Sequence, residues 1–436
     1  MQSTVSKVYE KIVYDQFVFY LEENNLFDNI QHGFRSGRSD ISAAVDFLEP
    51  IIQSVDKGEK VLGVFMDLSK AFDSVKHSIL LQKLKMLGLT SNSLSWFESY
   101  LSNRFQYVEI SHTSKNNRLF KIASRLQPST FGVPQGSILG PLLFLCYLKN
   151  ISQILTYIPE YNLCLYADDS NMKVSAKTVD EIEIITSSEL TNIGQYLKLH
   201  NLKLNVEKTI YMEFKTSQNK HSINPTIKYN ESLIEKHQDA KFLGITIDEN
   251  LNWNLHVNRL MNRLCSGIYA LSRMSFLANI ETLKMIYYSH ISYGLCLYGS
   301  TSNSNLDSIL RIQKKAIRII LKLKHEVSVR QYFKSLKIMT VYGQYILDTI
   351  MVTKSKQNGL TKHIKIHSYE TRNKSEIIPS HHRLGFYAKR PTYSGLIFLK
   401  HVPQAIKIEK NIDKFKRYLK DYLVDKAIYS FDEFFQ

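Results

Sequence analysis

The sequence is poor in the residues that interrupt or cross-link a chain. It has only 9 prolines and 17 glycines in 436 residues, which excludes collagen-like and linker-rich architectures. The cysteines have no short spacing between them, so neither a zinc knuckle nor a disulfide framework is expected. They are Cys146, Cys164, Cys265 and Cys296. We therefore expect a reducing compartment and no disulfide-linked partner.

Long apolar runs are also missing. One of the longest, at 141–148, is far shorter than the roughly 20 residues that span a bilayer. The first residues of the chain show no signal-peptide pattern. We expect an intracellular protein that is not secreted and has no membrane partner. With 44% hydrophobic and 22% charged residues, the composition is that of a globular protein.

Acidic residues are scarce only in the second part of the chain. Residues 251–436 contain 30 Lys and Arg against 12 Asp and Glu, a net charge of +18, whereas residues 1–250 carry −2. A basic region of this kind favours a polyanionic partner, nucleic acid before membrane. The alternative is a basic surface that serves solubility alone.

Strand and helix patterns alternate up to about residue 250, and helical patterns dominate after it. Buried strands are expected at 61–66 and 163–166, the second as the first arm of a hairpin with an acidic tip. Helices are expected at 75–87, 179–199, 255–278, 280–298, 306–323 and 412–424, and further strands at 209–214, 226–229 and 242–247. The sequence thus predicts an α+β region followed by a basic, mostly helical one.

Three aspartates stand where these strands end. Asp67 follows the first strand, and Asp168 and Asp169 lie at the hairpin tip. If the two strands are neighbours, the carboxylates repel each other and raise each other's pKa unless a cation lies between them. Mg²⁺ suits one or two carboxylates plus phosphate oxygens, and a pair of such ions promotes phosphoryl transfer. The alternative is that these aspartates are ordinary turn and cap residues.

Five sequence blocks follow one another in a specific order. They are QHGFR at 31–35, FMDLSKAFD at 65–73, GVPQGSILGPLLF at 132–144, YADD at 166–169, and LNVEKT at 204–209 with FLGITID at 242–248. A lone YADD is a weak signal, but the ordered set is specific. Together the blocks resemble the reverse transcriptase of a non-LTR (LINE-type, jockey-like) retrotransposon.

The resemblance implies a right-hand polymerase. Its α+β fold would have fingers, a palm of antiparallel sheet plus helices and a helical thumb, followed by a basic mixed C-terminal region. The implied parts are partial fingers at 1–60, a palm with fingers insertions at 61–250, a helical thumb and connection at 251–325, and the C-terminal region at 326–436.

The implied function is RNA-directed DNA polymerisation. A dNTP would be joined to a primer 3′-hydroxyl on an RNA template with two Mg²⁺ ions, for which Mn²⁺ could substitute. The implied partners are therefore an RNA template, a DNA primer and dNTPs. The element type implies nuclear action, with a cytoplasmic ribonucleoprotein.

The resemblance also assigns roles to individual residues. Asp67 and Asp168 would be the metal ligands, with Asp169 in support and the Leu68 carbonyl as a neutral oxygen ligand. Lys208 would donate a proton to the leaving pyrophosphate, a role open to lysine. Substrate contacts are implied for Arg35, Phe72, Gln135 and Gly136, and a primer grip for Leu243 and Gly244.

Four of these further assignments have an ordinary alternative. Phe72 could be a core side chain, Arg35 and Lys208 solvated surface charges, and 243–244 a simple hairpin turn. The predicted helix at 306–323 has a cationic stripe, which would follow a phosphate backbone or else belong to a solvated amphipathic helix. The stripe consists of Arg311, Lys315, Arg318 and Lys322.

The chain departs from the family pattern at its start and at two internal places. Residues 3–11 resemble a segment from inside the family's reverse transcriptase, so we expect the preceding fingers strands and the endonuclease to be missing, as in a truncated copy. Lys149-Asn150 stands where relatives usually have Asn-Asp, and Ser170 stands where Thr is usual. No metal ligand is lost. The alternative function is therefore a nucleic-acid-binding remnant with weak or no catalysis.

Overall fold

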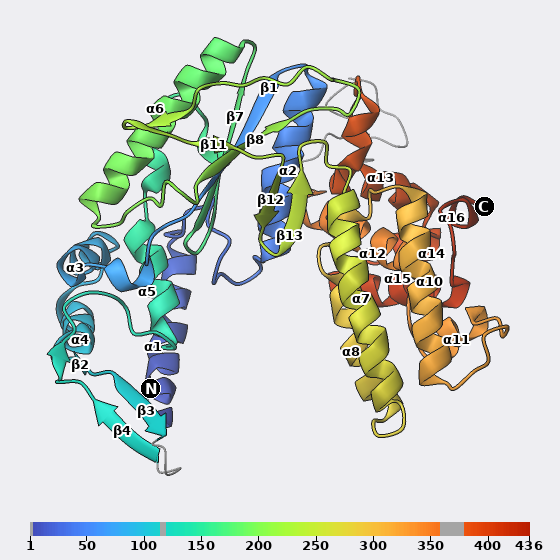
Figure 1. The fold of residues 1–436 in the computed structure, drawn as a ribbon, viewed down its shortest axis with the longest axis horizontal. Helices are drawn as coiled ribbons and strands as arrows, with labels where there is room; N and C mark the ends of the chain where they lie inside the picture. Colours follow the sequence, from blue (N-terminus) through green and yellow to red (C-terminus); the bar gives the residue numbers. More distant parts are fainter. Residues whose placement is uncertain (1–2, 114–118, 358–378) are drawn as a thin grey trace. The chain divides into compact units, whose positions relative to one another are not determined.

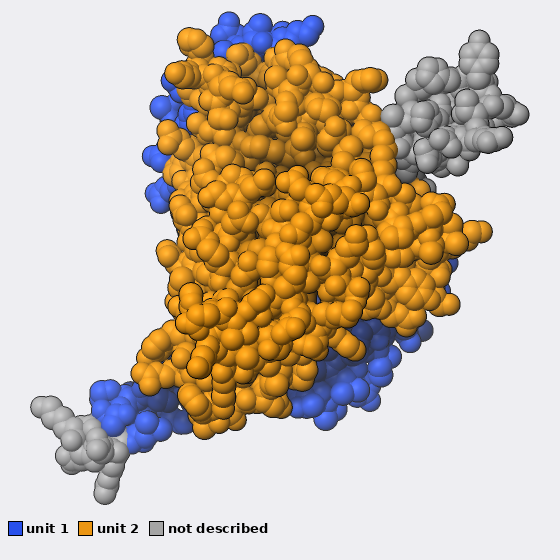
Figure 2. Space-filling view, turned by 90° about the vertical axis from the view of Figure 1, so that its right-hand side faces the viewer, with its two compact units in different colours: residues 1–43, 62–211, 223–236 blue, residues 44–61, 212–222, 237–436 orange. Residues whose placement is uncertain are grey.

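The computed structural model describes residues 3–113, 119–357 and 379–436. The chain forms two compact units, which Figure 2 distinguishes by colour. Unit 1 comprises 1–43, 62–211 and 223–236, and unit 2 comprises 44–61, 212–222 and 237–436. These units cross the predicted boundaries, because the predicted thumb and C-terminal region share one unit with part of the predicted fingers. The four-part functional division stays a prediction.

The central element is a five-stranded sheet in the order β11-β8-β1-β7-β6 (Figure 1). Its strands are β1 (Lys60–Met66), β6 (Leu163–Tyr166), β7 (Asp169–Ala176), β8 (Ile210–Phe214) and β11 (Glu235–Lys236). The apolar run at 61–66 is explained by its place in the middle of this sheet, where all six residues are buried. β6 and β7 pair antiparallel, but β11 pairs parallel with β8, so the prediction of an antiparallel sheet was wrong at this edge.

Helices and short hairpins complete unit 1. The helices are α1 (Thr4–Glu23), α3 (His77–Met86), α4 (Ser91–Leu101), α5 (Leu139–Leu148) and α6 (Val179–Leu199), with 3₁₀ turns η1 (Phe72–Ser74), η2 (Ile151–Ile154) and η3 (Glu160–Asn162). The short strands are β2 (Phe105–Gln106), β3 (Glu109–Thr113), β4 (Leu119–Ala123), β5 (Gln127–Pro128), β9 (Lys228–Tyr229) and β10 (Ser232–Leu233). α6 has the predicted bounds, because Thr178 and Glu181 form a capping box at its start.

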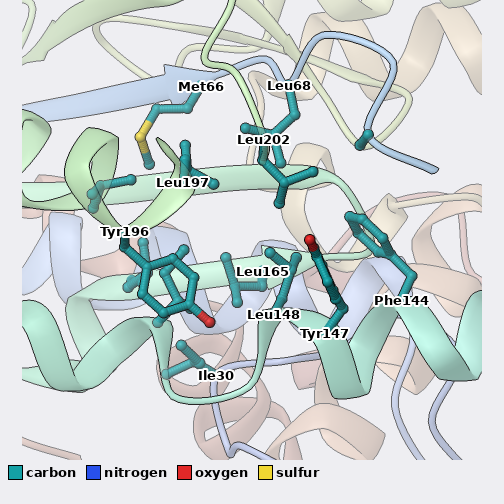
Figure 3. Close-up of a cluster of buried hydrophobic side chains, with 14 of the residues drawn as sticks. Ile30, Met66, Leu68, Phe144, Tyr147, Leu148, Leu165, Tyr196, Leu197 and Leu202 are labelled. Atoms are coloured by element: carbon teal, nitrogen blue, oxygen red, sulfur yellow. The ribbon is translucent and has the colours of Figure 1, made fainter. Parts of the chain in front are cut away.

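The core of unit 1 anchors the end of β1 (Figure 3). Met66 and Leu68 are buried, with 4% and 7% exposure, in the same apolar cluster as Leu165. Because side chains alternate along an extended chain, the intervening Asp67 faces away from this cluster. The core therefore fixes the backbone on both sides of the first predicted metal ligand.

A buried carboxylate ties α1 to the start of α5. Glu10 is 2% exposed, and its Oε2 accepts hydrogen bonds from the N–H groups of Ile138 (2.6 Å) and Leu139 (3.5 Å). Its Oε1 accepts from the Tyr100 hydroxyl (3.0 Å). A carboxylate at a helix N-terminus satisfies free N–H groups and interacts favourably with the helix dipole. The first helix of the chain thus positions the helix that follows the GVPQGS block.

Unit 2 contains one hairpin, the start of β1, the end of β8, and otherwise helices, of which α2 begins within unit 1. The hairpin is β12 (Asp239–Phe242) and β13 (Ile245–Asp248), and the helices are α2 (Asp40–Asp56), α7 (Asn254–Met274), α8 (Ile280–Ser292), α9 (Leu295–Tyr298), α10 (Asn303–Ile320), α11 (Arg330–Ser335), α12 (Val341–Ser355), α13 (Pro391–His401), α14 (Gln404–Lys407), α15 (Ile412–Lys426) and α16 (Asp432–Phe435), with the 3₁₀ turn η6 (Gly385–Lys389). The described residues beyond 248 contain no strand, which confirms the predicted change near residue 250. The C-terminal region is accordingly helical where it is described, not mixed.

Two acidic side chains of α2 hold the C-terminal part of unit 2. Glu49 accepts hydrogen bonds from the Thr392 N–H (2.9 Å) and hydroxyl (2.6 Å). Asp56 accepts from the N–H groups of Arg383 (3.0 Å) and Leu384 (2.7 Å). Hydrogen bonds that a charged carboxylate accepts are stronger than hydrogen bonds between two neutral groups. They explain why α2 belongs with residues more than 300 positions later.

The state of the cysteines and the hydropathy of the helices bear on two of the sequence-based expectations. All four cysteines are free thiols, and Cys265 is exposed whereas the other three are buried. Across the described ranges, no helix combines the length and the apolarity needed to cross a bilayer.

His256 on α7 is a buried base surrounded by cations. Its Nδ1 accepts a hydrogen bond from the Thr246 N–H (3.2 Å), which requires the neutral ring. Burial, followed by the charges of Arg263 and Arg259, lowers the pKa of His256 to about 4. In the unfolded chain a histidine has a pKa near 6.5. The unfolded state therefore binds more protons in between, and His256 lowers the stability of the fold as the pH falls from about 6.5 to about 4.

We predict that replacing His256 by Gln removes this part of the pH dependence. The shift corresponds to roughly 3 kcal/mol of unfolding free energy between about pH 7 and pH 4. Urea unfolding of the wild type and His256→Gln across this range measures the difference directly, since all other titrating groups are shared. Two parallel curves of stability against pH would contradict the prediction.

Candidate active site

The three predicted aspartates lie at one end of the sheet. β7 is the neighbour of β1, so Asp169 at the start of β7 comes close to Asp67 after β1. Asp168 lies in the two-residue turn that joins β6 to β7, beyond the Tyr166–Asp169 pair. Desolvation, followed by the charges of Asp168 and Asp67, raises the pKa of Asp169. The acids are thus close enough for Asp169 to interact electrostatically with both Asp168 and Asp67, as predicted.

These carboxylates do not form a complete metal site by themselves. In the described part of the chain, no three His, Cys, Asp or Glu side chains are arranged to hold a metal ion. Their oxygen donors fit Mg²⁺, which normally takes one or two carboxylates and completes its shell with water and substrate phosphates. The Leu68 carbonyl remains a predicted neutral ligand. Burial and, after it, repulsion from Asp168 and Asp67 raise the pKa of Asp169, and a bound cation would relieve the repulsion.

The loop before β8 holds the backbone around Asp67. The carbonyl of Asp67 accepts a hydrogen bond from the Asn205 N–H (2.8 Å), and its N–H points to the Thr209 Oγ1 (3.4 Å). Lys208 in the same loop places its Nζ 3.9 Å from the Asp67 Oδ2. The side chain of Lys208 is 70% exposed, so its amine is accessible beside the carboxylate. Its role as a proton donor stays a prediction.

Phe72 and the GVPQGS block lie on neighbouring segments of unit 1. The Phe72 ring is partly buried and stacks on Phe144 with centroids 4.5 Å apart, and the Phe72 carbonyl accepts from the Val133 N–H (3.0 Å). Gln135 donates from Nε2 to the Asp73 Oδ1 (2.9 Å). Both predicted substrate residues are therefore held by protein contacts. The partly buried ring of Phe72 agrees with the alternative of a core side chain, and its predicted contact with the sugar stays a prediction.

A cavity of about 670 Å³ adjoins this loop. It is lined by residues 128–135 together with Lys70, Asp73, His77 and others.

Gly136 has a left-handed backbone (φ +76°) and open space where a Cβ would be. Glycine at 136 is thus favoured by the backbone conformation, and its predicted substrate contact stays a prediction.

Arg35 is built into the interior of its loop. Its NH1 donates to the carbonyls of Asp28 (2.8 Å) and Gln31 (3.4 Å), and its guanidinium lies over the Phe27 ring. The side chain is only 10% exposed, and its NH2 lies 3.7 Å from a Glu22 carboxylate oxygen. Burial lowers the pKa of Arg35. This placement differs from a solvated arginine, and the predicted substrate contact stays a prediction.

The predicted primer grip is a tight turn in unit 2. Leu243 and Gly244 connect β12 to β13, so the predicted strand at 242–247 is in fact a hairpin. Both residues have positive φ (45° and 79°), the pattern of a type I′ turn, which favours glycine. The Tyr293 hydroxyl donates to the Leu243 carbonyl (2.6 Å). Their contact with a primer stays a prediction.

A cationic cavity of about 460 Å³ lies beside this turn within unit 2. It is lined by Gly244 and Thr246 of the hairpin, Leu260 and Tyr293, the cationic side chains Lys241, Arg259 and Arg263, and the histidines His256 and His290. His256 adds no charge near pH 7, because its pKa is about 4. Arg259 is engaged with Thr246 (2.7 Å) and Asp239 (3.6 Å). The cavity suits a phosphate group, because several positive charges converge on one hollow.

The predicted cationic stripe on α10 is shorter than expected. α10 ends at Ile320 and Lys322 has a left-handed backbone (φ +54°), so Lys322 does not continue the helical face. Arg318 donates two hydrogen bonds to the Val327 carbonyl (3.3 and 3.1 Å). Arg311 and Lys315 are exposed on the helix. The stripe on the helix itself therefore has two exposed residues, Arg311 and Lys315, and Lys322 is exposed beyond the end of the helix.

Sequence reasoning missed several residues that hold the predicted site residues within each unit. Gln31, Glu10 and Thr209 act through backbone N–H groups, and Tyr293 acts through a backbone carbonyl. Gln31 and Thr209 do lie inside two of the five blocks. Their place in a block was visible in the sequence. Their hydrogen-bond partners lie in distant segments, so these could not be identified from the sequence.

Comparisons with known proteins agree with the motifs. A family model described as "Reverse transcriptase (RNA-dependent DNA polymerase)" matches residues 1–247. The chain is 27% identical over 354 residues to a probable RNA-directed DNA polymerase from transposon BS of Drosophila melanogaster, covering 78% of this chain and 38% of that protein. It is 25% identical to the RNA-directed DNA polymerase from mobile element jockey of the same species, covering 77% and 36%.

Among solved structures, apo telomerase from Candida tropicalis aligns with a TM-score of 0.40 and 12% identity over 78% of this chain and 55% of that one. This overlap is too limited to carry an argument. The chain spans little more than a third of the two transposon relatives. The family model, in contrast, covers more than half of the chain and includes all five blocks except the last residue of the fifth. The chain therefore belongs to the reverse transcriptase family, whose fold is the right-hand polymerase.

Proposed function

We propose that this chain catalyses RNA-directed DNA synthesis of the non-LTR retrotransposon type. The observation that carries the proposal is the interaction of Asp67, Asp168 and Asp169 at the end of two adjacent strands, inside the region that matches the family. Reverse transcriptases use divalent metal ions. We propose two Mg²⁺ ions here, with Mn²⁺ as a substitute, held by Asp67 and Asp168 with support from Asp169 and the Leu68 carbonyl.

Divalent ions at this site would supply Lewis-acid stabilisation of the attacking 3′-oxygen and the leaving pyrophosphate. The protein's own contribution is positioning, because phosphoryl transfer leaves little covalent chemistry to side chains. Lys208, beside Asp67, would donate a proton to the pyrophosphate. Phe72, fixed by its stack on Phe144, would limit the space at the sugar, and Gln135 with Gly136 would line the path of the dNTP.

The cationic cavity of unit 2 supports a nucleic-acid role independently of the acids. Its basic side chains lie beside the turn at Leu243 and Gly244. We propose that a phosphate of the primer strand binds there, and that Arg311 and Lys315 on α10 contact the template–primer backbone elsewhere in the unit. Nuclear action with a cytoplasmic ribonucleoprotein is proposed from the element type alone.

Primer extension on an RNA template tests the catalytic proposal. We predict that Asp168→Asn lowers the rate of dNTP incorporation by at least about 100-fold, because a metal ligand is lost. The matched control is Asp180→Asn, which makes the same chemical change at an exposed position of α6 and should retain the wild-type rate.

Two results would contradict the proposal. One is extension that survives in Asp168→Asn. The other is a wild-type protein that binds primer–template but incorporates no dNTP with either Mg²⁺ or Mn²⁺. The second result would favour the nucleic-acid-binding remnant over the polymerase.

Salt-dependent binding tests the cavity. We predict that Arg263→Glu weakens primer–template affinity and reduces the slope of log K against log salt by about 1, the value for one lost phosphate contact. Arg273→Glu is the control, since Arg273 lies on the same helix outside the cavity lining. Fluorescence anisotropy at several salt concentrations gives both quantities. Equal effects of the two substitutions would show that charge alone, without a defined site, governs binding.

A further inference from the structure

The QHGFR block forms the outer edge of the catalytic hairpin. The Leu165 N–H of β6 donates to the Ile30 carbonyl (2.9 Å), and the His32 N–H donates to the Leu165 carbonyl (2.9 Å). These two bonds make a short parallel bridge between Gln31 and Leu165. The edge strand of the sheet is thereby paired over the residues that lead into the YADD turn.

The Gln31 side chain continues this contact to the tip of the hairpin. It is 4% exposed, and its Oε1 accepts hydrogen bonds from the N–H groups of Gly33 (2.8 Å) and Ala167 (3.2 Å). The bond from Gly33 orients the amide, so that the same oxygen faces Ala167. An acceptor from a distant segment therefore holds the residue directly before Asp168.

Ala167 needs such a partner because its backbone is unusual. It has φ +56°, a left-handed conformation that a residue with a Cβ adopts reluctantly. Two-residue hairpin turns with this geometry favour glycine at the first position. Strained backbone of this kind persists only when its surroundings hold it, and it is concentrated at functional sites.

Gly33 permits the close approach on the other side. A Cβ at position 33 would lie 2.6 Å from the Ala167 nitrogen and 3.2 Å from the Tyr166 carbonyl carbon. Both neighbours are backbone atoms and cannot move away like the end of a side chain. Any larger residue at 33 would therefore push the loop away from the turn.

We propose that Gln31 is a positioning residue for Asp168. By holding the left-handed Ala167, it fixes the turn that presents the Asp168 carboxylate toward Asp67 before any cation binds. The proposal depends on the proposed function, because it gives Asp168 the role of a metal ligand. Gln31 itself does not contact substrate in this proposal.

The test compares Gln31→Met with Gln313→Met. Both changes remove a buried glutamine oxygen that accepts a backbone N–H, since Gln313 is 2% exposed and accepts from Val341 (2.8 Å), but Gln313 lies in unit 2. We expect Gln31→Met to raise the Mg²⁺ concentration for half-maximal primer extension at least about tenfold, with primer–template affinity unchanged. Gln313→Met should leave the Mg²⁺ requirement unchanged even if it lowers stability.

Amide hydrogen exchange of the peptide that contains the β6–β7 turn gives a second readout. We expect at least about tenfold faster exchange there in Gln31→Met and not in Gln313→Met. Gly33→Ala is a second variant in case Gln31→Met does not fold, and it should change both readouts in the same direction.

A folded Gln31→Met protein with unchanged turn exchange and an unchanged Mg²⁺ requirement would overturn the inference. If the wild type shows no extension, the proposed function fails, and the exchange measurement alone then decides whether Gln31 holds the turn.

Discussion

The repulsion between carboxylates at one end of the central sheet is the constraint on which the rest of this account depends. Burial, followed by the nearby charges of Asp168 and Asp67, raises the pKa of Asp169. A chain without a use for this arrangement would gain stability by separating them, since like charges held together oppose folding. The arrangement has a clear use if a divalent cation binds among them, because the negative charges that repel one another all attract the ion.

Holding these acids in place requires support from residues that carry no catalytic role. On one side, Met66 and Leu68 are buried and fix the backbone of Asp67. On the other, Gln31 holds the turn before Asp168 through a backbone N–H. Glu10 likewise holds the start of α5, the helix after the GVPQGS block, by accepting a hydrogen bond from a backbone N–H. Each support is a buried polar or apolar contact, and the polar ones cost free energy unless their partners are present.

Much of this could be predicted from the sequence, for reasons that differ by element. The strand at 61–66 was visible because its neighbours bury both faces, and the helix at 179–199 because its cap residues are local. The apolar pattern at 242–247 predicted one strand across the turn of the hairpin β12–β13, because Leu243 occupies a turn position that normally attracts Asn or Asp. The alternative of a hairpin turn at 243–244 is confirmed.

The contacts between distant segments were beyond sequence reasoning. Nothing local to Arg35 shows that its guanidinium is buried against Phe27, and nothing local to Arg318 shows that it is bonded to Val327. The grouping of α2 with residues near 390 likewise depends on Glu49 finding Thr392. Charge patterns along a helix identify where cations lie, but not which of them are already engaged by the fold.

The central claim is that a divalent cation binds between Asp67 and Asp168, and localised cleavage tests it most directly. Fe²⁺ replaces Mg²⁺ in oxygen-ligand sites, and with ascorbate and peroxide it cuts the backbone beside the bound ion. We expect cuts near 66–69 and near 167–169 that excess Mg²⁺ suppresses and that are absent in Asp168→Asn. Cleavage elsewhere, or cleavage at these segments that neither Mg²⁺ nor the substitution changes, would contradict it.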